Sequence, residues 1–259
     1  MRWILAASVF LCASPAISQD AALPQDVVQT DNEAAAAALN RMSARLRSFD
    51  RFSVKVHAST EEVFKDGEKL QFLNETIYDV AKPDRLYASV RSDRIWRRYF
   101  YDGTSVTVSV PQAGYYASMP ASGPILTLLD RLEDSYGISV PLKDLFRWGT
   151  ADADPVTPTE AFLIGFAQVG EAATDQYFYR APGVDFQIWI GRDDDLPHRL
   201  VITNTDDVAQ PQYIAALEWD TSPSFAANRF TFQPDANSRK VPLRPDASLV
   251  AGEDQEADQ

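Results

Sequence analysis

The sequence predicts a mainly β protein of the α+β class, a curved antiparallel sheet of about eleven strands with an N-terminal helix and two middle helices. Three observations lead to this prediction. Apolar and polar residues alternate through most of residues 52–232, which is the period of half-buried strands. Short turns rich in Asp and Gly join successive strands, as in a meander. Two segments with helical periodicity interrupt the strands in the middle of the chain.

Residues 1–18 predict a cleavable secretory signal peptide. Arg2 is followed by an apolar run over residues 4–13, which is too short to span a bilayer at about 20 residues. Small residues precede Gln19 at Ala16 and Ser18. We therefore expect cleavage near Ser18/Gln19, a periplasmic protein, and no transmembrane segment further along the chain.

The composition excludes several classes of function. The only cysteine, Cys12, lies inside the signal, and Leu11 before it departs from a lipidation motif. The mature chain therefore has no disulfide, thiol nucleophile or cysteine metal site. A formal net charge of −13 argues against nucleic acid and against anionic lipid surfaces. With 45% hydrophobic residues, the chain can be held together by its core.

The first helix should follow a linker over residues 19–32 and open a single domain over residues 33–240. Thr30 and Glu33 have the spacing of a capping box. The apolar stripe of the helix should pack on a sheet, although its arginines leave a membrane-surface role as the alternative. That stripe is Leu39, Met42, Leu46 and Phe49. Residues 241–259 should form an acidic disordered tail.

The strands are expected in two series, separated by the middle helices. Pro124 opens the first of these helices and Gly137 ends it, and residues 142–148 form the second. The first series comprises residues 52–59, 70–80, 86–90, 95–101, 106–110 and 115–119. The second comprises residues 162–169, 176–180, 184–190, 199–205, 213–219 and 229–232.

An antiparallel sheet of this extent should curl, because strands twist. Its apolar face must be covered, and the three helices are the available cover. The volume between them is either packed solid or left partly open for an apolar ligand. Tyr and Trp side chains along the strands can pack this core or line the mouth of a cavity.

Three short motifs, in this order, resemble a known family. They are Tyr101-Asp102-Gly103 with alternating Val up to Pro111 and Gly114-Tyr115-Tyr116, the run from Asp195-Leu196-Pro197 to Ile202, and Phe230-Thr231-Phe232-Gln233-Pro234. This pattern is similar to the periplasmic lipoprotein-carrier superfamily of the LolA/LolB type, and most similar to its predicted periplasmic proteins of unknown function. The resemblance covers about residues 33–240.

The resemblance implies an unclosed β-barrel of about eleven strands with helices as a lid over an apolar cavity. Such a protein would carry a hydrophobic small molecule, a lipid or an acylated protein, without a cofactor or an enzymatic step. The alternative is a protein-interaction or envelope-sensing module that uses the same sheet, with an envelope protein as partner.

We expect the ligand to contact two sets of apolar residues. The strand set is Val54, Val56, Phe72, Tyr78, Val106, Val108, Phe186, Ile188, Leu217 and Trp219. The lid set is Ile125, Leu128, Leu129, Leu132, Leu145 and Phe146. Binding would be driven by burial of apolar surface, at about 25 cal/mol per Å².

Residues that could support catalysis or bind a metal are few. Residues 193–195 are three adjacent Asp, which suit a hairpin turn better than a calcium loop. Asp152 and Asp154 lie in a Pro-rich connection. His57 should point away from the core and His198 begins a strand, and no Gly-x-Ser-x-Gly elbow accompanies them. We therefore expect no catalytic residue and no metal.

Overall fold

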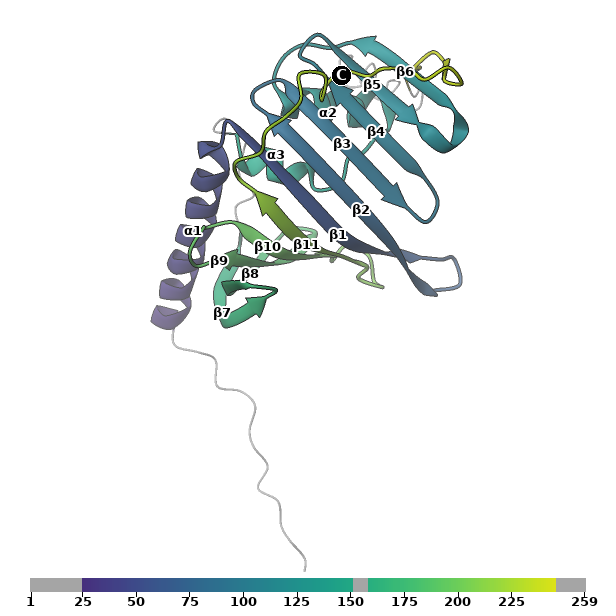
Figure 1. Ribbon diagram of the computed structural model, residues 1–259. Helices are drawn as coiled ribbons and strands as arrows, with labels where there is room; N and C mark the ends of the chain where they lie inside the picture. The colour runs from purple at the N-terminus through teal and green to yellow at the C-terminus, as the bar shows by residue number, and fades with distance from the viewer. Residues whose placement is uncertain (1–24, 151–157, 246–259) are drawn as a thin grey trace, which may run out of the picture.

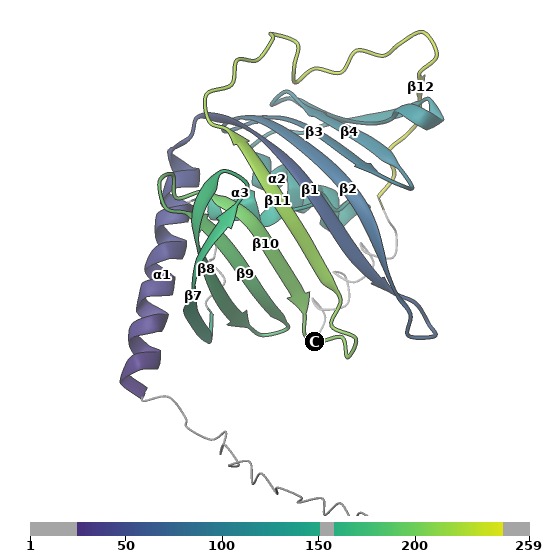
Figure 2. The same cartoon turned by 60° about the horizontal axis from the view of Figure 1, so that its bottom comes forward.

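The structure, a computed structural model, describes residues 25–150 and 158–245 of the 259-residue chain. Its strands form one twelve-stranded sheet that curves around two short helices and stays open (Figures 1 and 2). The predicted fold class, a mainly β half-barrel, is therefore confirmed. The strands are β1 (Arg51–Val63), β2 (Lys69–Ala81), β3 (Arg85–Ser92), β4 (Trp96–Tyr101), β5 (Ser105–Val110), β6 (Tyr115–Pro120), β7 (Glu160–Val169), β8 (Ala172–Ala181), β9 (Val184–Gly191), β10 (Pro197–Asn204), β11 (Gln212–Asp220) and β12 (Arg239–Lys240).

Two meanders make up the sheet, and the long strand β1 joins them. β1 pairs with β2 on one side and with β11 on the other, so the first meander, β1 to β6, continues into the second, β11 to β7. All of these pairs are antiparallel, and only the short β12 pairs in parallel, with β6. Tight turns make the reversals. At Gly103, with φ of 85°, a Cβ would lie 2.6 Å from Oδ2 of Asp84, so the turn needs glycine.

Helix α1 (Gln25–Ser48) runs along β7 at the edge of the second meander and reaches α3 (Figure 1). Its predicted apolar stripe is confirmed, because Leu39, Met42, Leu46 and Phe49 are all buried. The predicted start at the Thr30 capping box is wrong, because the helix begins at Gln25. No Gly or Pro separates Gln25 from Thr30 in the sequence, so nothing there stops the helix.

Helices α2 (Ile125–Tyr136) and α3 (Lys143–Trp148) lie between the two meanders in the chain and on the inner face of the sheet (Figures 1 and 2). The predicted limits of α2 are confirmed. Pro124 occupies its N-cap with extended backbone, and Gly137 ends it in the left-handed conformation with φ of 61°.

The chain after β11 crosses the outer face of the first meander before it reaches β12 (Figure 2). Phe232 packs there against Phe100 and Tyr116, with ring centroids 5.3 and 4.8 Å apart. The predicted strand over residues 229–232 is therefore wrong, since this segment is a turn. Phe232 contacts the outer face through its ring, and Phe230 packs edge to face on Phe225, instead of pairing as a strand.

Candidate ligand pocket

The register of the sheet brings the predicted strand residues to one face. Val54 of β1 lies opposite Tyr78 of β2 and Trp219 of β11, and Val56 lies opposite Leu217. Directly opposite side chains in antiparallel strands point to the same side of the sheet. These residues therefore share the inner face, toward the helices.

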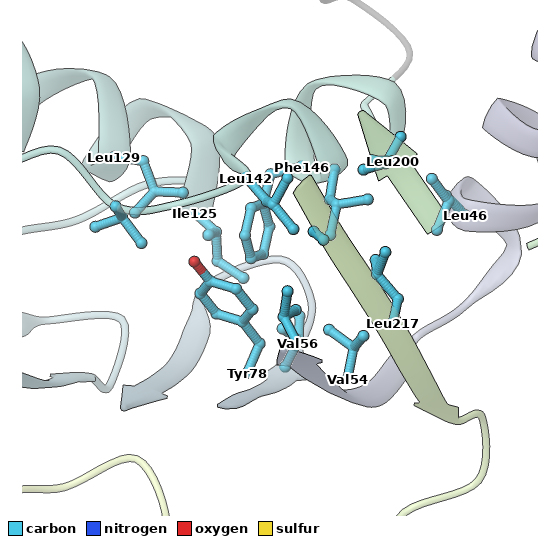
Figure 3. Close-up of a cluster of buried hydrophobic side chains, with 14 of the residues drawn as sticks. Leu46, Val54, Val56, Tyr78, Ile125, Leu129, Leu142, Phe146, Leu200 and Leu217 are labelled. Atoms are coloured by element: carbon cyan, nitrogen blue, oxygen red, sulfur yellow. The ribbon is translucent and has the colours of Figure 1, made fainter. Parts of the chain in front are cut away.

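Helices α2 and α3 cover this face with apolar side chains. Figure 3 shows Tyr78 and Val56 of the sheet pointing toward Ile125, Leu129 and Phe146 of the helices. The rings of Tyr78 and Phe146 meet edge to face, with centroids 5.5 Å apart and an angle of 82°. Tyr78 and Val56 are 0% exposed and Leu129 is 1% exposed. Most of the interior is therefore filled by side chains.

Three buried tyrosines, here called the anchor tyrosines, link the sheet to the helices by hydrogen bonds. Each projects from the inner face and donates its hydroxyl hydrogen to a backbone carbonyl of a helix or of the chain next to one. Burial raises the pKa of all three phenols, so they remain neutral donors. The three pairs are Tyr78 with Pro141, Tyr101 with Gly123 (2.5 Å) and Tyr179 with Ala35 (2.8 Å).

One apolar hollow remains where the three helices meet the end of the sheet, and we call it the seam pocket. Its volume is about 250 Å³. The end of α1, the start of β1, the first turn of α2, and one side of α3 with the two residues after it form its walls, and the Lys82-Pro83 turn closes one side. The apolar wall residues are Leu46, Phe52, Ile125, Leu126, Leu145 and Phe146.

A second, wider hollow of about 400 Å³ lies between residues 139–144 and the strands β10 and β11, and we call it the mouth hollow. It carries charge, because Lys143 forms ion pairs with Asp130 at 3.0 Å and with Glu133. Tyr213 also lines it, and burial raises the pKa of this phenol. Its hydroxyl is buried and has no hydrogen-bond partner in the described part of the chain.

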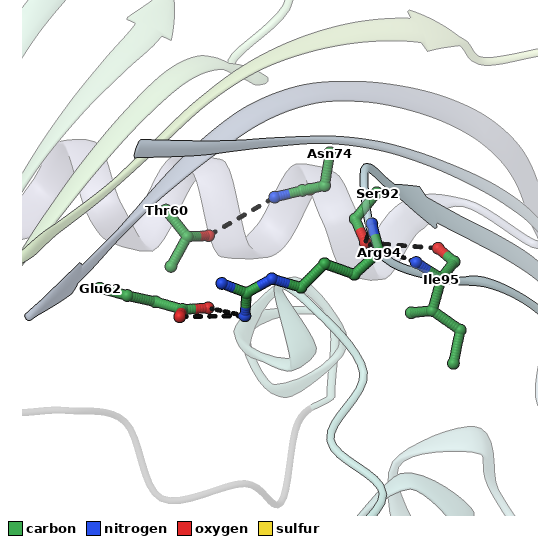
Figure 4. A network of polar contacts seen from close by, with 6 residues as sticks. All are labelled: Thr60, Glu62, Asn74, Ser92, Arg94 and Ile95. Carbon is green, nitrogen blue, oxygen red and sulfur yellow. Dashed lines mark hydrogen bonds and ion pairs between the residues drawn. The ribbon is translucent and has the colours of Figure 1, made fainter. Parts of the chain in front are cut away.

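A polar network borders the open end of the inner face (Figure 4). Arg94 Nη1 donates to both carboxylate oxygens of Glu62, at 2.9 and 3.0 Å. The Arg94 guanidinium also lies over the ring of Phe72, 3.8 Å from its centroid. Asn74 donates to Thr60 beside this pair, at 3.5 Å. The inner face is therefore polar at its open end, whereas the seam pocket is apolar.

The sequence of residues 35–244 matches a family described as predicted periplasmic protein (DUF2092). The chain belongs to this family. The predicted resemblance to periplasmic proteins of unknown function is thereby confirmed. No protein of curated function matches the sequence. In the described part of this DUF2092 chain, no helix has both the length and the apolar character needed to cross a membrane.

Several solved structures are similar to this DUF2092 chain. LprF from Mycobacterium bovis is 11% identical, with a TM-score of 0.45, and the match covers 77% of this chain and 99% of LprF. An uncharacterized conserved protein from Thermus thermophilus is 10% identical, with a TM-score of 0.44, covering 81% and 99%. The LolA superfamily protein NE2245 from Nitrosomonas europaea is 12% identical, with a TM-score of 0.32, covering 76% and 97%.

The predicted contact residues lie in different places in this DUF2092 chain. Ile125, Leu145 and Phe146 line the seam pocket. Phe72 lies under Arg94 outside the buried core, and Trp219 is half-buried and donates its Nε1 hydrogen to Pro197 O at 2.8 Å. The others pack in the buried core: Val54, Val56, Tyr78, Val106, Val108, Leu128, Leu129, Leu132, Phe186, Ile188 and Leu217.

Sequence reasoning missed part of the pocket wall. Leu46 was predicted only to pack on the sheet. Lys82 and Pro83 fall in the connection between the predicted strands over residues 70–80 and 86–90, which was predicted only as a short turn. The turn lies at the pocket because Lys82 contacts the end of α1, 36 residues earlier in the chain. A contact over that separation leaves no local pattern in the sequence. Phe52 carried a signal, since it follows the predicted strand alternation, whereas Leu126 lies off the apolar stripe of its helix.

The candidate catalytic residues form local structural contacts. Asp194 binds His198 Nε2 at 3.0 Å and accepts from the Leu196 N–H at 3.0 Å. Burial works to raise the pKa of Asp194, but these hydrogen bonds lower it below 3.8 overall. His57 is exposed, as predicted. Within the described residues, no three His, Cys, Asp or Glu side chains are grouped to hold a metal. Asp152 and Asp154 lie outside the described residues.

Proposed function

We propose that this protein is a non-enzymatic periplasmic binding protein that holds one apolar chain, such as an acyl chain, in the seam pocket. The observation that carries the proposal is the apolar hollow of about 250 Å³ between the helices and the sheet. Concave, mostly apolar pockets are the usual sites for small ligands in proteins. Three predicted contact residues, Ile125, Leu145 and Phe146, lie in its wall.

The volume sets the size of the ligand. Typical ligand pockets have about 300 to 1,000 Å³, so this one has room for a single narrow chain. Outside the seam pocket and the mouth hollow, side chains pack the interior, and two or three acyl chains in the seam pocket would require α2 and α3 to move. Each methylene buried in the pocket contributes about 0.8 kcal/mol to binding.

A neutral fluorescent probe tests this proposal. Phenylnaphthylamine should bind the mature protein and gain fluorescence as it leaves water. Leu126→Trp places a large ring at the partly buried wall of the pocket and should weaken binding at least tenfold. The matched control is Leu73→Trp, at a position that is 64% exposed, and its affinity should equal that of the wild type.

Two results would contradict the proposal. The first is a wild-type protein that binds neither the probe nor fatty acids. The second is a Leu126→Trp variant that is folded, by circular dichroism, and binds the probe as tightly as the wild type. In that case the ligand would lie elsewhere on the protein.

A second candidate function is binding of an extended apolar segment of an envelope protein at β7. No described strand pairs with the outer edge of β7, which exposes Leu163, Ile164 and Phe166. Such an edge can accept a further strand. Asn32 of α1 already accepts from the Ala161 N–H at 2.6 Å and α1 contacts β7, so a partner strand would pair only with the part of this edge that α1 leaves open. Ile164→Lys should abolish cross-linking to such a partner and leave probe binding unchanged.

A further inference from the structure

The lining of the seam pocket contains one charged residue, Lys82. Lys82 follows β2 directly and reaches the end of α1. Its Nζ donates to the carbonyl of Leu46 at 2.6 Å and lies 3.5 Å from that of Arg47. Among the described residues, no carboxylate lies within ion-pair distance, 4.0 Å, of this ammonium. The direct contacts of the cation are therefore with backbone carbonyls.

The surroundings of Lys82 leave its charge incompletely compensated. Burial lowers the pKa of Lys82, the carboxylate of Asp50 raises it by less, and the guanidinium of Arg47 lowers it again. Asp50 is an exposed residue, and Arg47 Nη1 lies 3.5 Å from Trp148 O. A half-buried ammonium among apolar walls is stabilised by an anion that reaches it. Since an ammonium has three donors, at least one remains for such an anion.

We propose that the seam pocket selects an anionic amphiphile, with its apolar chain among Phe52, Ile125 and Phe146 and its terminal carboxylate or phosphate on the Lys82 ammonium. This inference rests on the proposed function and names the class of ligand. It concerns one molecule in a pocket, so it agrees with a net charge of −13, which disfavours contact with an anionic membrane surface.

Calorimetry with three ligands of equal chain length tests the inference. The mature wild-type protein is titrated at neutral pH with decanoate, decyl phosphate and decanol. A charge-assisted hydrogen bond should make at least one of the two anions bind about tenfold or more tightly than decanol. The anion that binds more tightly identifies the head group as a carboxylate or a phosphate. Equal affinity of all three ligands would overturn the inference and leave the proposed function standing.

Variants then assign the preference to Lys82. Lys82→Met should lose the preference for the anion over decanol, whereas Lys82→Arg should keep it. The matched control is Lys55→Met, which removes an outer lysine that pairs with Glu75 at 3.0 Å and should leave the preference unchanged. A folded Lys82→Met variant that still prefers the anion would overturn the inference. If the wild type bound none of the ligands, the proposed function itself would fail.

Discussion

Two parts of the same helix meet very different surroundings. Ile125, in the first turn of α2, lines the seam pocket, whereas Leu129, about one turn later, packs in the filled interior. Toward Leu129, β2 directs the large side chain of Tyr78 (Figure 3). At Ile125, the chain reverses at Pro83, whose carbonyl accepts the Ile125 N–H at 2.9 Å. The Lys82-Pro83 turn presents backbone to Ile125, whereas a strand would direct a side chain toward it. We attribute the seam pocket to this difference.

The largest expected effect contrasts these two parts directly. Leu129→Ala should lower the free energy of unfolding by about 2 to 5 kcal/mol, because it opens a cavity in the filled core. Leu126→Ala, at the partly buried wall of the seam pocket, should cost about 1 kcal/mol or less. Urea denaturation of both variants measures the difference. Equal losses would contradict the contrast between a filled interior and an unfilled seam.

A smaller effect is expected at the anchor tyrosines. Tyr101→Phe removes the hydroxyl that donates to Gly123 O and leaves that carbonyl without this partner, which should cost about 1 kcal/mol. Tyr115→Phe is the matched control, since Tyr115 is 41% exposed. The midpoints of urea unfolding provide the measurement. If both variants unfolded like the wild type, the hydroxyl would not fasten the start of α2.

The smallest effect concerns the dependence of stability on pH, at Asp194. The pKa of Asp194 is lowered in the folded protein from its usual value of 3.8. The ionised Asp194 carboxylate therefore contributes fully to stability only above the pKa that it has in the unfolded chain. The contribution is lost as the pH falls through the folded-state pKa. Because the Asp194 side chain is 38% exposed, we expect less than about 1 kcal/mol.

Acid denaturation checks this expectation. Asp194→Asn should weaken the fall in stability at low pH, and Asp66→Asn, in the exposed β1–β2 turn, should leave it as in the wild type. If the Asp194→Asn variant lost stability at low pH as the wild type does, the contact between Asp194 and His198 would not stabilise the fold.

The local parts of the fold could be predicted from the sequence. Strand alternation and turns such as residues 65–68 located the hairpins, and Pro124 and Gly137 marked both ends of α2, because these signals act within a few residues. The segment around Phe232 was mistaken for a strand, since alternating aromatic residues suit both a strand and a segment lying on a sheet.

The candidate site could be predicted only in part. Apolar residues of the inner face were identified correctly as one face, but periodicity does not distinguish a residue that fills the core from one that lines a hollow. Leu129 and Ile125 follow the same stripe and differ only in what the sheet places opposite them. The position of Lys82 depends on where α1 ends in space, which the sequence around Lys82 does not encode.

The central claim is that the seam pocket holds a single apolar chain, and native mass spectrometry of the protein purified from its own periplasm tests it most directly. We predict an additional mass of one single-chain lipid on the wild-type protein and its loss in Leu126→Trp. A wild-type protein that carries no lipid, or a lipid that Leu126→Trp retains, would contradict the claim.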